Sequence, residues 1–213
     1  MKIAHIADTH IRNYKYHREY REIFDLIYDR LKTEKVDYIV HCGDLAHTKT
    51  QLSPEYFDLA TSFLKNLADI APTYIILGNH DGNLKNEHRQ DAITPIANAL
   101  RHPNLNLLKN AGETIVEGNI AFNVLSVFDE ENWVKPTSDK RINIALYHGS
   151  VSGVTTDTGW VMTHGDHPIE VFEGHDYVLL GDIHKTNQIL DNEGRVRYPG
   201  STVQQNFGET DDK

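Results

Sequence analysis

The stretch IAHIADTH, at residues 3–10, joins a short apolar run to a polar turn that carries an Asp and a His. Its apolar part, residues 3–7, predicts a buried β-strand. Two further apolar runs, at residues 36–40 and 74–77, are also followed by polar turns, and helix-patterned segments separate the three runs. This β-α-β-α-β order predicts a mainly parallel sheet with helices on its faces.

The helix-patterned segments have recognisable boundaries. Residues 18–34 place apolar side chains at helical spacing. A second helix is predicted to start at Ser53, the N-cap, with Pro54 in the first helical position. A third is predicted over residues 90–101. The remaining runs predict short strands and favour a more antiparallel second half, at residues 105–108, 113–117, 119–127, 142–147, 177–180, 188–190 and 195–198.

Composition limits the class of protein. The chain has 213 residues and a net charge of −10, which fits one domain and argues mildly against a large basic nucleic-acid footprint. Its single cysteine, Cys42, excludes a disulfide framework and a Cys-rich zinc site. No apolar run is long enough to span a membrane, and no signal-peptide pattern opens the chain, so we expect a cytoplasmic, intracellular protein.

Metal-binding residue types follow five of the predicted strands. Carboxyl ends of strands are where α/β sheets build their sites, so we expect these side chains to converge. Glycine precedes the polar residue in three of the five turns, which permits unusual backbone angles and close approach. The side chains are Asp8 and His10, Asp44, Asn79 and His80, His148, and Asp182 and His184.

The mixture of carboxylate, amide and imidazole groups without cysteine suits Mn²⁺, Fe²⁺, Zn²⁺ or Mg²⁺. The candidates are too many for one tetrahedral ion and suit two ions about 3.5–4 Å apart that share a carboxylate. Such a pair holds a phosphate and activates water. Each motif alone is typical of a polar turn, but five in order, each at a strand end, favour a site.

These motifs resemble the calcineurin-like metallophosphoesterase superfamily over nearly the whole chain. Within it, the chain is most similar to the SbcD-type nucleases of double-strand-break repair. The narrower likeness rests on residues 5–10, on residues 43–47 followed by Ser53 and Pro54, and on residues 198–203 leading to Gly208 and Glu209.

The resemblance implies the roles of the metal-binding residues. The implied ligands are Asp8, His10 and His184 for the first metal, Asp44 as the bridge, and Asn79 and His148 for the second metal. His80 is then the general acid or a phosphate-stabilising group, and His47 is a supporting catalytic residue. Asp81 is either the partner that orients the His80 imidazole or a turn residue.

One position departs from the superfamily pattern. The usual Gly-His-x-His is Gly-Asp-Ile-His here, which places Asp182 where a histidine is expected. We interpret Asp182 as a metal ligand that makes the second site more anionic. Such a site favours Mn²⁺, or Mg²⁺, over Zn²⁺.

The resemblance further implies an α/β fold, a four-layer αββα sandwich of two mixed β-sheets flanked by helices. Residues 1–213 are then one catalytic domain, without the capping and ATPase-binding regions that follow it in the nucleases. The implied function is DNA cleavage as exonuclease and single-strand endonuclease, in a homodimer with an SbcC-type, SMC-like coiled-coil ATPase. Alternatives are a phosphatase or cyclic-nucleotide phosphodiesterase of the superfamily, or a non-catalytic binding module.

The remaining histidines are predicted to be structural or solvated. His5 and His41 lie in or beside strand runs and are expected to be packed. The cluster of His164, His167 and His175 matches no metal motif and is interpreted as a loop. Cys42 is expected to be buried at a strand end.

Overall fold

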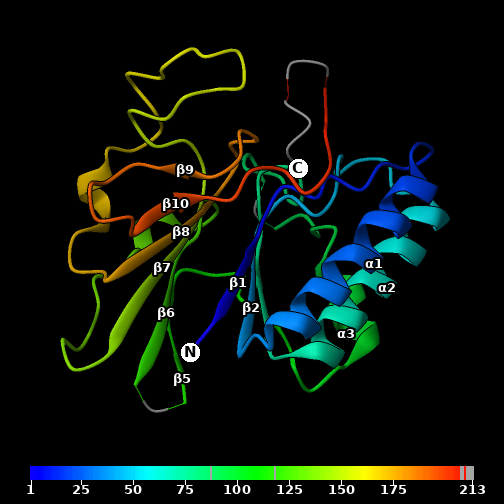
Figure 1. The fold of residues 1–213 in the computed structure, drawn as a ribbon, viewed down its shortest axis with the longest axis horizontal. Helices are drawn as coiled ribbons and strands as arrows, with labels where there is room; N and C mark the ends of the chain where they lie inside the picture. The colour runs from blue at the N-terminus through cyan, green and yellow to red at the C-terminus, as the bar shows by residue number, and fades with distance from the viewer. Residues whose placement is uncertain (87, 118, 207–208, 210–213) are drawn as a thin grey trace.

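Two β-sheets lie face to face at the centre of the molecule (Figure 1). This is a computed structural model, and it describes residues 1–86, 88–117, 119–206 and 209. Side chains of both sheets fill the space between them; the Tyr74 and Phe122 rings, for example, have centroids 4.9 Å apart. The predicted α/β class with two sheets flanked by helices is confirmed.

The first sheet is parallel in all its pairs and has the order β1-β2-β3-β4. Its strands are β1 (Ile3–Ile6), β2 (Tyr38–Cys42), β3 (Thr73–Ile76) and β4 (Leu105–Leu107). The last of these was expected in the more antiparallel second half, but it pairs with β3. The parallel pairing places the carboxyl ends of these strands at one edge of the sheet.

Three α-helices cover the outer face of the first sheet: α1 (His17–Glu34), α2 (Pro54–Ile70) and α3 (Thr94–Leu100) (Figure 1). The predicted N-cap is present, since the Ser53 hydroxyl accepts a hydrogen bond from the Tyr56 N–H at 3.2 Å. Phe24 of α1 stacks on Phe63 of α2 with ring centroids 4.1 Å apart. The two apolar stripes therefore pack against each other as well as against the sheet.

The second sheet is mixed and has the order β5-β6-β7-β8-β10-β9. Its strands are β5 (Gly112–Val116), β6 (Ile120–Leu125), β7 (Ile142–His148), β8 (Tyr177–Gly181), β9 (Gln188–Ile189) and β10 (Val196–Tyr198). Only the outer pairs, β5–β6 and β9–β10, are antiparallel. The expected antiparallel predominance is wrong because β6, β7 and β8 are joined by long crossovers, which parallel pairing requires.

Those crossovers contain little regular structure. They carry the 3₁₀ helices η1 (Glu130–Asn132) and η2 (Ile169–Phe172), and their apolar side chains cover the outer face of the second sheet. Phe172 of η2, for instance, lies with its ring centroid 5.7 Å from that of Tyr147 on β7. In the part of the chain that the structure describes, no helix has the length and apolar character needed to cross a membrane.

Candidate metal centre

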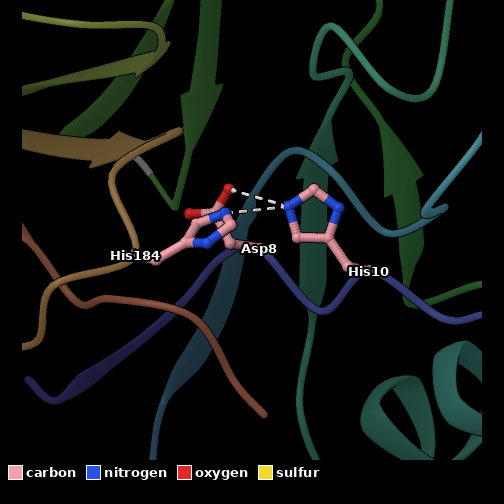
Figure 2. A group of neighbouring side chains, drawn as sticks. All are labelled: Asp8, His10 and His184. Carbon is pink, nitrogen blue, oxygen red and sulfur yellow. Dashed lines mark hydrogen bonds and ion pairs between the residues drawn. The ribbon is translucent and has the colours of Figure 1, made fainter. Parts of the chain in front are cut away.

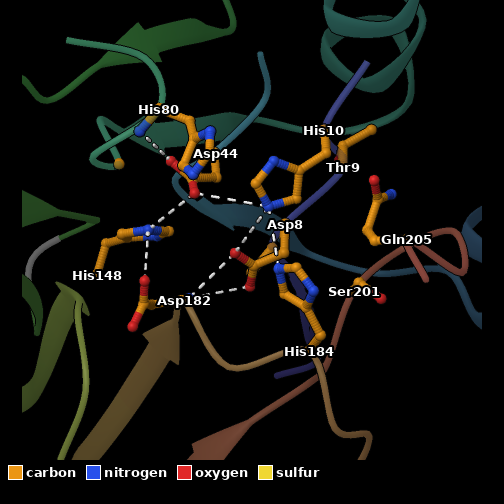
Figure 3. A network of polar contacts seen from close by, with 12 residues as sticks. Asp8, Thr9, His10, Asp44, His80, His148, Asp182, His184, Ser201 and Gln205 are labelled. Atoms are coloured by element: carbon orange, nitrogen blue, oxygen red, sulfur yellow. Dashed lines mark hydrogen bonds and ion pairs between the residues drawn. The ribbon is translucent and has the colours of Figure 1, made fainter. Parts of the chain in front are cut away.

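Polar side chains from five strand ends meet between the two sheets, as predicted (Figure 3). Four of them are almost completely buried: Asp8, His10, Asp44 and His148 have exposed fractions of 0–3%. Buried ionisable groups require compensation by paired charges or by a metal ion. The arrangement of their donor atoms shows which of these the site provides.

The first group of donors comprises Asp8, His10 and His184 (Figure 2). The Nε2 atoms of His10 and His184 lie 3.0 Å apart, and His10 Nε2 lies 3.8 Å from Asp8 Oδ1. One donor atom from each residue lies within 4.8 Å of the others. Two imidazole nitrogens and a carboxylate oxygen that face one point can hold a divalent cation.

Asp44 lies between this group and a second one (Figure 3). Its Oδ2 is 3.6 Å from His10 Nε2 and 3.3 Å from His148 Nε2. Its Oδ1 accepts a hydrogen bond from the His80 N–H at 2.7 Å. This central position is the one that a carboxylate shared by two metals must occupy.

The second group contains His148, Asp182 and Asn79. His148 Nδ1 donates a hydrogen bond to the Cys42 carbonyl at 2.7 Å, which turns Nε2 toward Asp44 and to within 3.8 Å of Asp182 Oδ1. That Nε2 atom is buried and makes no hydrogen bond, and together with Asp8 and Asp44 it forms a group whose donor atoms could hold a metal ion. Asn79 Nδ2 donates to Asp182 Oδ1 at 3.2 Å. A cation takes an amide oxygen, so Asn79 could hold one only with its amide group rotated.

Burial and mutual charge shift the pKa values of these groups strongly. Burial raises the pKa of Asp8 to about 7 and lowers that of His10 to about 3. Burial acts in the same directions on Asp44 and His148. It is outweighed, however, because their mutual attraction and other neighbours lower the pKa of Asp44 and raise that of His148. Buried carboxylates that stabilise a proton would also stabilise a divalent cation at the same place.

The backbone at the site is unusual. Asp8, His10, Asp44 and Asp182 have positive φ angles of 52°, 47°, 56° and 95°. Such angles are uncommon outside glycine, although Asp and His tolerate them better than most residues, and they concentrate at functional sites. Gly43 has φ 85°, and a Cβ there would lie 2.5 Å from an imidazole nitrogen. This close approach supports the prediction that a glycine before the polar residue permits unusual backbone angles and close packing.

His80 and His47 lie beside the first group. The His80 ring centroid is 4.9 Å from that of His10 and 6.1 Å from that of His47. His80 Nδ1 donates a hydrogen bond to the His47 carbonyl at 2.7 Å. This contact fixes the His80 ring and leaves its Nε2 available to a substrate.

The interpretation of Asp81 as the partner of the His80 imidazole is wrong. The buried Asp81 carboxylate instead accepts hydrogen bonds from three backbone N–H groups. The donors are Asp44 at 2.8 Å, Ala46 at 2.9 Å and Gly78 at 2.9 Å. Asp81 therefore ties the loop after β2 to the loop after β3, and so holds the ligand-bearing turns together.

Replacement of Asp81 with alanine should destabilise the fold substantially. It leaves three buried N–H donors without partners, at a cost of about 1–3 kcal/mol each, so we expect a loss of about 3 kcal/mol or more. Urea unfolding with EDTA present measures the change without a metal contribution. Asp58→Ala, which removes an exposed carboxylate paired with Arg21, is the control and should cost under about 1 kcal/mol. Equal losses in the two variants would contradict this role.

Glu209 belongs to the segment that resembles the nucleases, and the structure shows it as a buried partner of His184. Glu209 is 4% exposed, and its Oε1 accepts a hydrogen bond from His184 Nδ1 at 2.9 Å. It also accepts from Ser201 Oγ at 2.9 Å and from the Gln205 N–H at 3.0 Å. A carboxylate behind a metal-binding imidazole fixes the orientation of the ring.

Glu209→Gln should weaken binding of the first metal about 10–100-fold, the usual effect of removing such a supporting contact. Calorimetric titration of the metal-free protein with Mn²⁺ measures the affinity directly. Glu193→Gln, which changes an exposed carboxylate near Arg195, is the matched control. Identical affinities for both variants would show that Glu209 acts on folding alone.

The other histidines behave as structural residues. His5 bonds the Leu180 carbonyl at 2.9 Å, and His41 bonds Thr9 at 2.8 Å, so both are packed as predicted. His167 packs against the Trp133 ring at a centroid distance of 4.8 Å. Among the described residues, no candidate metal group includes it. Cys42 is buried as expected, and burial raises the pKa of its thiol.

The sequence model of the calcineurin-like phosphoesterase family matches residues 1–186, and the chain belongs to that family. "Uncharacterized protein R555" of Acanthamoeba polyphaga mimivirus is 41% identical over 98% of this chain and 16% of its own length. "Putative phosphoesterase 244L" of Invertebrate iridescent virus 6 is 28% identical over 99% of this chain and 73% of its own length. The chain thus spans less than a fifth of the first relative.

Two solved structures found by comparison share little sequence with this chain. A novel archaeal phosphodiesterase has a TM-score of 0.42 and 12% identity, covering 94% of this chain and 84% of its own. The nuclease MPE of Pseudomonas putida has a TM-score of 0.37 and 18% identity, covering 65% of this chain and 57% of its own.

Proposed function

We propose that the chain is a two-metal phosphodiesterase that cleaves DNA. The position of Asp44 carries this proposal. One of its oxygens lies within 3.6 Å of imidazole nitrogens from two separate groups of donors, and the other accepts from the His80 backbone. The site thus combines a carboxylate able to bridge two metals with an imidazole beside it that can transfer a proton.

Each residue then has a defined task. Asp8, His10 and His184 would hold one metal, Asn79, His148 and Asp182 would hold the other, and Asp44 would be shared. When bound, the two cations supply positive charge for the phosphate and activate a water molecule. The water oxygen would form a bond to phosphorus and release one proton to solvent, as the bond between phosphorus and the leaving oxygen breaks. His80, held by the His47 carbonyl, would give a proton to the leaving oxygen.

The choice of DNA as substrate follows from two features shared with the repair nucleases, His47 and residues 198–203. Residues of that segment contact the site: Ser201 N–H donates to the His184 carbonyl at 3.1 Å, and Thr202 N–H donates to the Asp8 carbonyl at 3.2 Å. The segment is therefore part of the wall of the site. A homodimer and an SbcC-type ATPase partner complete the proposal for the whole protein.

The metal preference depends on Asp182. Because carboxylate oxygen favours harder ions, we expect cleavage with Mn²⁺ and loss of cleavage with Zn²⁺ alone. Asp182→His restores the family pattern, tolerates the positive φ, and should shift the preference toward Zn²⁺. Asp182→Ala should lower the bound Mn²⁺ from two ions to one. Full turnover of the unaltered protein with Zn²⁺ would contradict this account of the residue.

A panel of substrates tests the function itself. Purified protein with Mn²⁺ is assayed on linear duplex DNA, single-stranded DNA, phosphomonoesters and cyclic nucleotides. DNA cleavage at rates well above those on the other compounds supports the proposal. Preference for monoesters or cyclic nucleotides favours the phosphatase or cyclic-nucleotide phosphodiesterase alternative. Absence of hydrolysis with two metals bound favours a binding module.

A further inference from the structure

A second hollow of about 360 Å³ lies beside the loop that carries His80. That volume falls at the lower end of the range of small-molecule sites. Its lining includes Gly82, whose Cα lies at most about 7.6 Å from that of His80, because two successive peptide units separate them. The hollow therefore adjoins the metal centre without containing any proposed metal ligand.

The hollow is built at the same sheet edge as the metal centre. Its lining comes from the loop after β3, which carries Gly82 and Arg89, from Asn110 after β4, and from Phe128 after β6. Strand β4 is parallel to β3, and β6 is parallel to β7, which ends in His148. All three loops thus leave the carboxyl ends of their strands, where ligands bind in such folds.

The lining offers the contacts that a nucleotide needs. Phe128 supplies an aromatic ring next to the β3 loop; a Cβ at Gly82 would lie 2.8 Å from its Cζ atom, so glycine permits the approach. Asn83 and Asn110 supply amide groups for hydrogen bonds to a base. Bases of single strands are held by stacking on aromatic rings and by hydrogen bonds of this kind.

The charges of the lining leave one cation for a phosphate. Asp91 is paired with Lys109 at 2.8 Å, and Asp129 accepts hydrogen bonds from the Ala111 N–H and Asn132 Nδ2. The guanidinium of Arg89 makes no hydrogen bond or ion pair with any residue the structure describes. Arg89 is thus available to bind the phosphate of a strand that enters the hollow.

We infer that this hollow, lined by Phe128, Arg89, Asn83 and Asn110, binds the nucleotide on the leaving-group side of the cleaved bond. The inference rests on the proposed function, in which His80 protonates the leaving oxygen. The loop that bears His80 continues into the lining of the hollow at Gly82 and Asn83, so a strand whose leaving oxygen faces His80 has the hollow within reach. A strand bound in this way places one base on Phe128 and one phosphate near Arg89.

Variants of the hollow test the inference with single-stranded oligonucleotides. Arg89→Ala and Phe128→Leu should each raise KM about tenfold, consistent with the contribution of one stacked base or one phosphate contact. Neither should alter the binding of Mn²⁺ to the metal-free protein, because no proposed metal ligand lines the hollow. Arg101→Ala and Phe57→Leu, at exposed positions outside the hollow, are the matched controls. Unchanged KM in the two hollow variants would overturn the inference.

A binding measurement separates this inference from the proposed function. Fluorescence anisotropy of a labelled oligonucleotide, with EDTA present, reports affinity without cleavage. Phe128→Leu should weaken binding of the normal strand and leave binding of an abasic strand unchanged. An equal effect on both strands would overturn the base contact. Failure of the unaltered protein to cut DNA with Mn²⁺ would overturn the nuclease proposal instead, whatever the anisotropy shows.

Discussion

Replacement of His80 with glutamine is expected to slow DNA cleavage about 10²–10⁴-fold, the range for loss of a general acid. Glutamine can still donate a hydrogen bond, but it cannot transfer a proton to the leaving oxygen. The Asp44 carboxylate is held by the backbone N–H at this position and not by the imidazole, so the bridge should remain in place. The expected result is therefore low turnover with two Mn²⁺ ions still bound.

The leaving group distinguishes the two roles that His80 can have. Bis(p-nitrophenyl) phosphate releases a stable anion that needs no proton, so loss of a general acid should affect its hydrolysis much less than cleavage of DNA. Loss of a phosphate-stabilising group should affect both substrates equally. His164→Gln, at an exposed position outside the hollow, is the control. Equal turnover of DNA by the His80 variant and the unaltered protein would show that the imidazole has no catalytic role.

Asp44→Asn should abolish activity by removing the shared ligand of both metals. The variant keeps the size of the side chain and removes the charge that lies within 3.6 Å of both His10 and His148. We expect turnover to fall by about 10³-fold or more, because two-metal catalysis needs both ions in place. Metal analysis of the purified variant should show fewer than two ions per chain.

Thermal unfolding measures metal binding by the Asp44→Asn variant independently of activity. A ligand that binds only the folded state raises the melting temperature. Added Mn²⁺ should therefore raise the Tm of the unaltered protein and have much less effect on Asp44→Asn. Both proteins are first compared in EDTA, where a similar Tm shows that the variant folds. An equal Mn²⁺-induced rise in the two proteins would mean that Asp44 is not a metal ligand.

Much of the fold was predictable because the spacing of apolar side chains along the sequence differs between strands and helices. The Ser53–Pro54 helix start and the parallel β1-β2-β3 order follow from residue type and spacing. Strand order in the second sheet was not predictable in this way. Strand β10 lies between β8 and β9, and this placement depends on the path of irregular crossovers.

The candidate site was also predictable only in part. Residues such as Asp44 and His148 were found because they follow strands, whose carboxyl ends must meet at one sheet edge. The supporting contacts were not found, because backbone groups provide many of them. The His47 carbonyl holds His80, the Cys42 carbonyl orients His148, and three backbone N–H groups engage Asp81. Backbone groups are common to all residues, so sequence does not reveal such pairings.

The two-metal site itself is tested most directly by anomalous diffraction from crystals grown with Mn²⁺. Two manganese peaks about 3.5–4 Å apart are expected. The Asp44 carboxylate should lie between them, with His10 and His184 at one peak and His148 at the other. A single peak, or peaks located away from Asp44, would contradict the account.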